Sequence, residues 1–484
     1  MTKLKLDNGA AALLERLHGA GYRAYAVGGC VRDCLLGLAP HDWDLCTSAR
    51  PEQVIALFGG SRCIPTGLQH GTVTVKWGGA LYETTTFRTE GTYSDGRHPD
   101  TVAFVPEVEA DLARRDFTIN AMAYSAEEGL IDPFGGQADL AAGIVRAVGE
   151  PKRRFEEDAL RILRLYRFAA RFGFSIEPAT GGAARALAGH LDCVSAERIQ
   201  EELLKLLAAP QPGRDLEPAV LAVILPELQP IAQPERFEGL CRVIDRLPPG
   251  AENVPTRLAA LLAPLDEGQV RQVLRRLKCS NALTDEVEVL EGESVLLPRS
   301  QDRWAGSSSE DRPLGWDPVA AGNRAGDGMA CNSDDCGQWP KQGGAVGAAA
   351  SRVQGPDKGR SDRWEPQPDF VSPAPTLSLQ AKRLLGRYEL PTVKRLTALC
   401  TAQSPAQAEA FAALQAEAER LTAKNACCRV SQLAVNGRDL MAVGIPAGPG
   451  LRRMLAALLE AVITDRIPNE KAALLDAAAR FSAS

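Results

Sequence analysis

The sequence predicts an α+β fold in which an α/β region of about 150 residues is followed by helices alone. Two patterns support this prediction. Before residue 150, apolar residues at helical spacing alternate with short runs rich in β-branched residues, and after it only the helical spacing recurs. The chain of 484 residues exceeds the ~250–300 residues at which a single core stops growing, so we expect several domains.

The elements of the α/β region can be predicted in chain order. Its first three segments predict a short amphipathic helix, a buried strand and a second helix: 9–21, 25–29 and 31–38. Residues 41–49 (HDWDLCTSA) then predict a short strand. The β-branched, alternating segments 71–77 and 81–88 predict two antiparallel strands.

The second part of the chain is expected to be all helical, with one interruption. Five segments repeat apolar residues at helical spacing: 155–174, 195–209, 257–265, 268–278 and 451–463. Residues 293–376 are instead dominated by Gly, Ser, Asp, Pro and Arg. Because such a stretch cannot bury enough apolar surface to offset the entropy lost on ordering, we predict a disordered low-complexity insertion there.

Composition excludes several classes of protein. The formal net charge of −6 gives no global basic field, so a nucleic-acid site would have to be a local patch. The N-terminus lacks an unbroken apolar segment typical of a signal peptide, and no run of about 18 apolar residues predicts a membrane span. We therefore expect a cytoplasmic protein whose 12 cysteines, which show no zinc-ligand spacing, are mostly buried thiols.

A glycine pair follows the predicted buried strand. Gly28 and Gly29 carry no side chains, so their N–H groups can approach a phosphate, and the next helix directs its positive end toward the same anion. Arg32 adds a planar donor fork suited to a phosphate or ribose oxygen. Glycines at a strand-to-helix turn often serve geometry alone, so the pair by itself leaves both interpretations open.

Two aspartates, Asp42 and Asp44, lie one residue apart in the predicted strand 41–49. Residues i and i+2 of a strand project to the same face, where two carboxylates repel each other unless a cation lies between them. Mg²⁺ bound by carboxylates and substrate phosphates meets this requirement. Such a pair is often a surface turn or cap, but its place shortly after a phosphate-type turn favours metal-dependent phosphoryl transfer.

Four motifs in fixed order resemble one family. GGxVRD, DxD, RRDFTINAMA and EDALRILRLYRF begin at residues 28, 42, 114 and 157. Together they resemble the class II branch of the polymerase-β-like nucleotidyltransferases, and within it the bacterial CCA-adding tRNA nucleotidyltransferases. The resemblance covers about residues 20–280 and returns at about 378–480.

The resemblance implies roles for the first two motifs. Gly29 and Arg32 would contact the phosphates of the incoming nucleotide. Asp42 and Asp44 would be the catalytic carboxylates that hold two Mg²⁺ ions, which steady the triphosphate and activate the attacking 3′ oxygen. It also implies a head domain with a mixed five-stranded sheet.

The third motif supplies further nucleotide-binding candidates. By resemblance, Arg115 would reach the nucleotide, and Asp116 and Asn120 would shape the ribose region. The alternative for this segment is a solvated charge cluster at the start of a helix.

The fourth motif permits two interpretations. Glu157 and Asp158 are spaced to form ordinary helical ion pairs with Arg161, worth a few tenths of a kcal/mol each. Asp158 and Arg161 on one helical face also present an acceptor and a donor fork, which can match the base edges of cytosine and adenine. The resemblance implies this second role.

Arg164 and Arg167 continue the same helical face at steps of three residues. Residues 151–172 contain seven Lys and Arg against three Asp and Glu, a local charge of +4. We expect this to be the basic patch, and the resemblance adds both arginines to the nucleotide-binding set.

Residues 86–105 resemble the flexible loop of complete CCA-adding members, with candidate residues Arg88, Glu90, Asp95 and Arg97. Enzymes that add only CC are expected to lack this loop, so its presence favours addition of the terminal A. Poly(A) polymerases of the same branch are expected to carry a basic signature where this chain has CIPTGLQHGTVTV. An A-adding enzyme, a poly(A) polymerase and an inert RNA-binding module remain alternatives.

The expected reaction is template-independent addition of CCA to the 3′ end of tRNA from CTP and ATP, with release of pyrophosphate. The partners are the acceptor end of tRNA, CTP and ATP, with no membrane, and the oligomeric state stays open. The expected domains are a head, a neck, a helical body, the insertion, and a second body and tail part: 1–150, 151–210, 211–292, 293–376 and 377–484.

Overall fold

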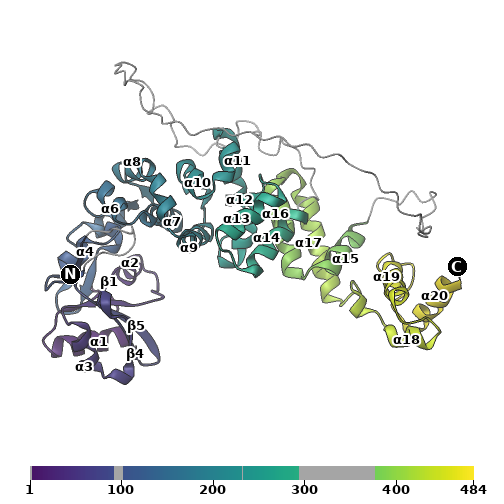
Figure 1. Cartoon of the computed structure of the whole chain (residues 1–484), viewed down its shortest axis with the longest axis horizontal. Coiled ribbons are helices and arrows are strands. Elements are labelled where there is room, and N and C mark those ends of the chain that lie inside the picture. The colour runs from purple at the N-terminus through teal and green to yellow at the C-terminus, as the bar shows by residue number, and fades with distance from the viewer. Residues whose placement is uncertain (1–2, 92–101, 232, 294–375, 484) are drawn as a thin grey trace, which may run out of the picture. The chain divides into compact units, whose positions relative to one another are not determined.

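A computed structural model of the protein describes residues 3–91, 102–231, 233–293 and 376–483. A mixed sheet near the N-terminus is followed by helices (Figure 1), which confirms the predicted α+β fold. All but the two end residues of the predicted insertion lie outside the described ranges. The division of the chain into five parts stays a prediction.

The main sheet has seven strands among the described residues, not the expected five. Neighbouring strands are antiparallel except for the parallel pair β2 and β5, and the spatial order is β3 (Cys63–Gly67), β4 (Thr72–Trp77), β5 (Ala80–Thr86), β2 (Asp44–Thr47), β1 (Ala24–Val27), β8 (Ala123–Ser125) and β9 (Gly129–Ile131). The antiparallel pairing of β4 with β5 was predicted. The hairpin of β8 and β9 has strands of three residues, too short for an alternating pattern to identify.

Both faces of the sheet are covered, which explains the unbroken apolar run of β1. Ala24 and Ala26 belong to a core shared with α1 (Asn8–Gly19) and α3 (Pro51–Phe58), whereas Tyr25 and Val27 belong to a second core with Val108 of α4 (Val108–Ala113). Successive strand residues point to opposite faces. A strand buried on both sides therefore needs apolar residues at every position.

Shorter elements connect the sheet to the helical part. The glycine turn leads from β1 into α2 (Gly29–Leu35), and α5 (Gly136–Ala142) follows β9. Two small two-stranded sheets pair β6 (Arg88–Glu90) with β7 (Val102–Phe104), and β10 (Ile144–Val145) with β11 (Ser175–Ile176). The predicted helices at 9–21 and 31–38 correspond to α1 and α2.

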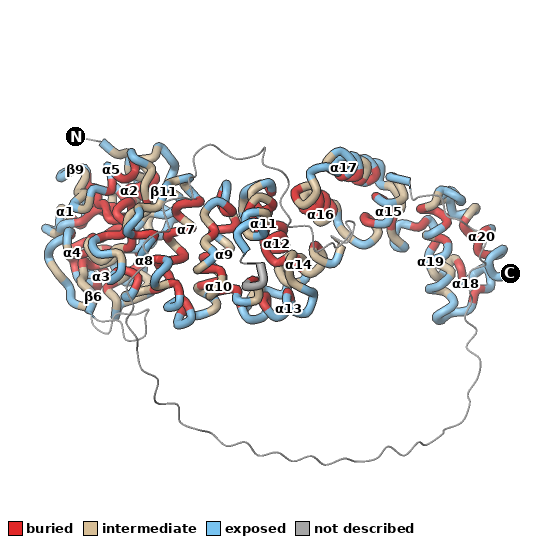
Figure 2. The backbone as a smooth tube through the Cα atoms, turned by 90° about the horizontal axis from the view of Figure 1, so that it is seen from above, coloured by how far each residue is buried: buried red, intermediate tan, exposed pale blue. Residues whose placement is uncertain are grey.

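From residue 151 onward the described chain is almost entirely helical, as predicted. The helices before the gap are α6 (Pro151–Glu157), α7 (Leu160–Phe172), α8 (Pro178–Ala186), α9 (Ala196–Leu207), α10 (Pro218–Ile224), α11 (Pro234–Arg246), α12 (Val254–Leu262), α13 (Glu267–Arg276) and α14 (Asn281–Glu293). Those after it are α15 (Leu377–Arg387), α16 (Leu390–Gln403), α17 (Ala408–Ala423), α18 (Gly437–Ala442), α19 (Pro449–Ile463) and α20 (Lys471–Ala483). Buried residues line one side of most of these helices (Figure 2), as their periodicity requires.

Segment 155–174 was predicted as one helix, and this is wrong. It forms α6 and α7, because Asp158 adopts an extended backbone conformation between them (φ −149°, ψ 104°). The carboxylate of Asp158 accepts a hydrogen bond from the N–H of Leu160 at 3.1 Å. An aspartate that bonds to the backbone in this way competes with helix continuation.

A fully buried arginine fixes α12 against the end of α9. Arg257 donates hydrogen bonds to the carbonyl oxygens of Leu207 at 2.6 Å, Leu247 at 2.6 Å and Pro210 at 3.2 Å. The last carbonyl groups of a helix have no partner within it. Arg257 satisfies some of these groups where water cannot reach them.

No helix in the described ranges is long and apolar enough to cross a bilayer.

Asp215 lies in a short 3₁₀ turn beside α11. Burial raises the pKa of Asp215 to about 6, with the neighbouring Asp245 adding to the rise and Arg214 opposing it. Asp245 in turn accepts a hydrogen bond from the N–H of Gly213 at 2.7 Å. Asp215 therefore binds a proton more tightly in the folded protein than in the unfolded chain.

Replacing Asp215 by asparagine should raise the melting temperature at pH 7.5. Because the folded pKa lies above the unfolded value of about 3.9, the contribution of Asp215 to stability is full below pH 4 and is lost as pH rises through 6. Because asparagine stays neutral, we expect the free energy of unfolding of D215N to exceed that of wild type by about 1–2 kcal/mol at pH 7.5. Melting curves of wild type and D215N at pH 4.5 and 7.5 measure it, with the exposed Asp285→Asn as control. An equal difference at both pH values would contradict the assignment.

Candidate active site

The glycine turn is shaped by both of its residues. Gly28 has a positive φ of 77°, and its N–H donates to the carbonyl oxygen of Met122 at 3.0 Å. A Cβ atom at Gly28 would lie 2.7 Å from Nη1 of Arg115. Gly28 is therefore required both for its backbone conformation and for the close approach of Arg115.

Arg32 is buried on α2, the helix that begins at the glycine turn. A Cβ atom at Gly29 would lie 3.5 Å from Nη2 of Arg32. The guanidinium donates to Asp33 at 2.8 Å and to Oδ1 of Asn120 at 2.5 Å, and its Cζ lies 4.8 Å from the ring centroid of Phe172. Burial lowers the pKa of Arg32 although Asp33 opposes this shift. Much of the hydrogen-bonding capacity of the Arg32 guanidinium is therefore used by protein groups.

The two aspartates of the DxD motif are both exposed, but only one of them belongs to a strand. Strand β2 begins only at Asp44, and Asp42 lies in the preceding bend with 86% of its side chain exposed, 3.1 Å from His41. The expectation that both project from one strand is wrong. Strand β1 lies beside β2 and ends at Val27, because the chain turns at Gly28. The last residues that pair between the two strands are Ala26 and Leu45.

A third carboxylate faces Asp44 from the neighbouring strand. Glu83 of β5 is paired with Asp44 in the parallel β2–β5 register. Desolvation by the surrounding protein raises the pKa of the Asp44 carboxyl. The charges of Glu83 and Asp42 raise this pKa further, whereas Arg115 lowers it. Glu83 was not predicted from the sequence, although its exposed place in the alternating segment LYETTTF was a usable signal.

Asp42, Asp44 and Glu83 are the candidate ligands for a divalent cation. Among the described residues, no group of three or more His, Cys, Asp or Glu side chains is arranged to hold a metal ion by itself. The mutual repulsion that raises the pKa of Asp44 is nevertheless the field that a cation relieves. The residues fit an ion that takes part of its shell from phosphate oxygens, as Mg²⁺ does.

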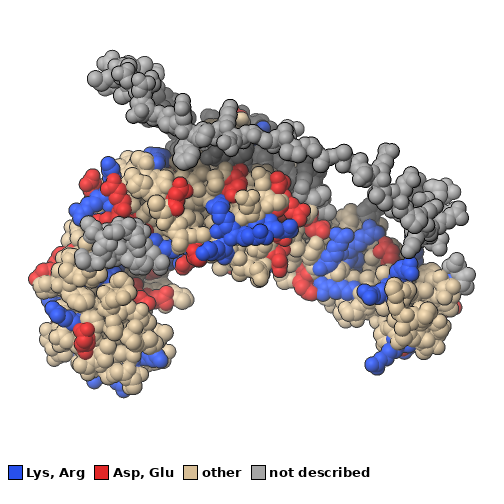
Figure 3. Space-filling view, viewed as in Figure 1, with Lys and Arg blue, Asp and Glu red and all other residues tan. Residues whose placement is uncertain are grey.

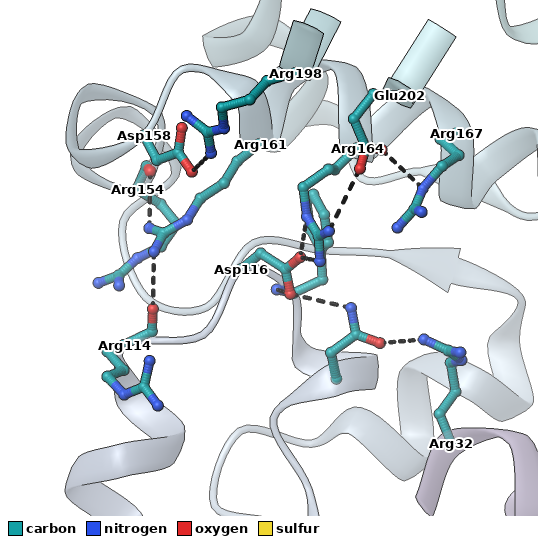
Figure 4. A network of polar contacts seen from close by, with 12 residues as sticks. Arg32, Arg114, Asp116, Arg154, Asp158, Arg161, Arg164, Arg167, Arg198 and Glu202 are labelled. Carbon is teal, nitrogen blue, oxygen red and sulfur yellow. Dashed lines mark hydrogen bonds and ion pairs between the residues drawn. The ribbon is translucent and has the colours of Figure 1, made fainter. Parts of the chain in front are cut away.

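Asp116 joins the turn to helix α7 (Figure 4). Its Oδ1 accepts hydrogen bonds from the N–H of Phe117 at 2.8 Å and from Nδ2 of Asn120 at 3.0 Å, and its Oδ2 accepts from Nε of Arg164 at 2.9 Å. Burial alone would raise the pKa of Asp116, but Arg164 and Asn120 outweigh it and hold this pKa well below its usual range. Asn120 also holds Arg32, so the predicted residues form one network.

The predicted basic patch over residues 151–172 is exposed in part, because the side chains of Lys152, Arg153 and Arg171 are 66%, 73% and 48% exposed, whereas Arg164 and Arg167 pair with an acidic group. Nε of Arg167 lies 3.0 Å from Oε2 of Glu202 on α9, and Nη1 of Arg164 lies 3.7 Å from Oε1 of the same carboxylate. Burial lowers the pKa of Arg167 to about 10 while Glu202 opposes the shift. Acidic groups remote in sequence neutralise the local charge, and Glu202 carried no signal in the sequence analysis.

Asp158 and Arg161 do not face each other as a helical pair. Nη2 of Arg198 on α9 lies 2.8 Å from the carboxylate of Asp158. Arg161 instead donates to Glu157 at 2.8 Å and to the carbonyl oxygens of Arg154 at 3.0 Å and Arg114 at 3.1 Å (Figure 4). The predicted pair of Glu157 with Arg161 is confirmed, and the break at Asp158 separates that residue from Arg161. The roles in base recognition stay predictions.

The predicted flexible loop is described only at its ends. Arg88 begins β6 and donates to the carbonyl oxygen of His70, and β6 pairs with β7. Asp95 and Arg97 lie outside the described residues, as does most of the segment between the two strands. Glu90 is described only as part of the backbone of β6.

Three family models match segments of the chain. They are the Poly A polymerase head domain over residues 24–146, the probable RNA and SrmB-binding site of polymerase A over 173–232, and the putative tRNA nucleotidyltransferase domain 2 over 384–478. The first model spans the glycine turn, both aspartates and Asp116.

Characterised proteins resemble the chain over most of its length. A CCA-adding enzyme of Lactiplantibacillus plantarum is 44% identical over 292 residues, 59% of this chain and 70% of the relative. One from Levilactobacillus brevis is 34% identical over 97% of this chain and 96% of the relative. The crystal structure of the Bacillus stearothermophilus CCA-adding enzyme in complex with CTP matches with a TM-score of 0.68 at 28% identity, covering 98% of this chain and 97% of that chain.

Proposed function

The chain belongs to the family of CCA-adding enzymes, and on that premise we propose that it adds CCA to the 3′ end of tRNA without a nucleic-acid template. The substrates are CTP, ATP and the acceptor end of tRNA, and each transfer releases pyrophosphate. The related enzyme crystallised with CTP supports this choice of nucleotide.

The observation that carries the proposal is the network between the glycine turn and helix α7. Asn120 binds both Arg32 of α2 and Asp116, and Asp116 binds Arg164 of α7. A nucleotide whose triphosphate lies against the turn therefore has its base directed toward protein side chains held in fixed positions. We assign base recognition to Asp158 and Arg161, with Arg164 and Arg167 supporting them.

Asp42 and Asp44 are the proposed ligands of two Mg²⁺ ions, with Glu83 beside Asp44. Bound there, Mg²⁺ would neutralise the triphosphate and lower the pKa of the attacking 3′ hydroxyl. Gly29, Arg32 and Arg115 are the proposed contacts of the triphosphate, and Arg115 approaches the glycine turn closely. The side chains of Asp116 and Asn120 are proposed to shape the ribose region of the site.

Recognition of tRNA is proposed to depend on backbone shape and charge, because the deep groove of A-form RNA hides the bases. Lysine and arginine side chains gather over the helical part of the chain, interleaved with acidic ones (Figure 3). Affinity for tRNA should therefore fall with added salt. We place the reaction in the cytoplasm, where tRNA and free nucleotides are both present.

An extension assay tests the proposed function against its alternatives. Purified protein with Mg²⁺ is given a tRNA transcript that lacks CCA or one that ends in CC, each with CTP, ATP or both. Growth of the first transcript to CCA and no further is expected. Extension of the CC-ended transcript alone would show an A-adding enzyme. Long A tails would show a poly(A) polymerase. If neither transcript is extended, the protein is an inert RNA-binding module.

Changing Arg161 to lysine should relax the choice of nucleotide more than it lowers the rate. Lysine keeps the charge but cannot donate to Glu157 and two carbonyl oxygens from one planar fork. We expect incorporation of UTP or GTP to rise about tenfold, as one lost hydrogen bond predicts. Sequencing of product ends measures it.

A matched control for this variant is Arg153→Gln. Arg153 pairs with the same Glu157 at 3.4 Å, but its side chain is 73% exposed. The control should keep wild-type selectivity. If R161K does the same, Arg161 has only a structural role.

A further inference from the structure

Asp111 is a fully buried carboxylate near the glycine turn and the arginines of the RRD motif. It lies on α4, with 0% of its side chain exposed, beside the RRD motif. A buried ionised group persists only when it is paired, and then it fixes the geometry of its partners. The inference developed from it deepens the proposed function and rests on that function.

The two oxygens of Asp111 have different partners. Oδ1 accepts the backbone N–H of Arg88 at 3.3 Å and Nε of Arg114 at 3.0 Å. Oδ2 has no hydrogen bond of its own among the described residues, and it lies 3.5 Å from Nη2 of Arg115. Arg88 and Arg114 thus hold the carboxylate in place, and Oδ2 faces Arg115.

Arg115 has donors that no described protein group uses. Its Nε is buried and has no hydrogen-bond partner among the described residues, and Asp111 is its one ion-pair partner there. Its Nη1 lies so close to Gly28 that any side chain at that position would collide with it. Arg115 also lowers the pKa of Asp44, against the effect of burial.

Other arginines of the network differ in this respect. Arg32 is engaged by Asp33 and Asn120, Arg164 by Asp116, and Arg161 by Glu157 and two carbonyl oxygens. Arg115 alone among these four combines a buried, unpartnered donor with a place over the glycine turn. It is the arginine best placed to donate to an incoming phosphate.

We infer that Asp111 is a positioning residue, which holds the guanidinium of Arg115 over the glycine turn so that its free donors meet the triphosphate of the nucleotide. Asp111 does not touch the nucleotide itself. Its effect on catalysis must therefore pass through Arg115, and this distinguishes it from a residue that only stabilises the fold.

A double-mutant cycle tests this dependence. Extension of a tRNA that lacks CCA is measured for wild type, Asp111→Asn, Arg115→Gln and the double variant. We expect each single variant to lower kcat/KM for CTP about 10- to 100-fold, the effect of one charge-assisted hydrogen bond. In the R115Q background, D111N should change kcat/KM by less than about twofold. Additive losses would overturn the inference.

Folding effects are separated by two further variants. Asp139→Asn removes another buried carboxylate paired with an arginine, and it should leave KM for CTP near the wild-type value. If D111N does not fold, the cycle is run with Asp111→Glu, which keeps the charge but displaces the oxygens, and the same non-additivity is expected.

The experiment also distinguishes the inference from the proposed function. If wild type adds no nucleotide to tRNA, the proposed function fails, and calorimetric titration with CTP and Mg²⁺ replaces the rates in the same cycle. Weaker CTP binding by D111N, absent in the R115Q background, would support the inference even then. Wild-type CTP binding by D111N would overturn it.

Discussion

The Asp44→Asn variant is expected to lose nucleotide transfer by about 10³-fold or more, because a proposed metal ligand and its negative charge disappear together. Asp44 begins β2 beside Glu83, so an amide of the same shape leaves the sheet unchanged and relieves the repulsion between the carboxylates. Single-turnover extension of a tRNA lacking CCA measures the loss. The affinity for tRNA should stay within a few fold of wild type.

Glu107→Gln is the control for this variant. Glu107 is an exposed carboxylate that pairs with Arg23 at 2.7 Å in the same part of the chain, away from the proposed metal ligands. Its loss should cost less than about 1 kcal/mol of stability and no activity. Retained transfer by D44N would remove the basis for the metal assignment.

Replacing Asp116 by asparagine should destabilise the protein by about 3–5 kcal/mol at pH 7, the cost of leaving a buried charge without its partner. Asp116 is 7% exposed and binds Arg164 at 2.5 Å, and its loss leaves Arg164 only the longer ion pair with Glu202, at 3.7 Å, among the described residues. The melting temperature measures the effect. Asp476→Asn, which breaks an exposed ion pair with Arg480, should leave the melting temperature nearly unchanged.

The effect of this variant should depend on pH in one direction. Arg164 and Asn120 outweigh burial and place the folded pKa of Asp116 below the unfolded value of about 3.9. Its contribution to stability is therefore complete above pH 5 and is lost as pH falls below 4 toward the folded pKa. The difference in melting temperature between wild type and D116N should narrow in acid. A constant difference would contradict the electrostatic explanation.

Much of the fold follows from local sequence patterns. The buried strand at Ala24–Val27, the turn at Gly28 and the helical half were all predicted, because each depends on periodicity or on the absence of a side chain. The strand count was too low because β8 and β9 are shorter than any detectable alternation. The break at Asp158 was not predicted, because the sequence alone does not show that the carboxylate of Asp158 accepts a hydrogen bond from the N–H of Leu160.

The candidate site was less accessible to such reasoning. The motifs identified the members of the network, but their partners come from remote segments: Glu202 reaches Arg167 from α9, and Arg198 reaches Asp158 from the same helix. Local spacing therefore could not show that two arginines of the predicted basic patch, Arg164 and Arg167, pair with a remote carboxylate. Glu83 meets Asp44 only through the parallel strand register, which a crossover connection creates.

We propose that side chains of the protein, without a template, choose C, then C, then A. It is tested most directly by giving wild-type protein, Mg²⁺ and a tRNA lacking CCA an equal mixture of all four nucleoside triphosphates, and sequencing every product end. We expect products that end in C, CC or CCA, with CCA accumulating and nothing beyond it. Products with mixed bases, or homopolymer tails that grow past three nucleotides, would contradict it.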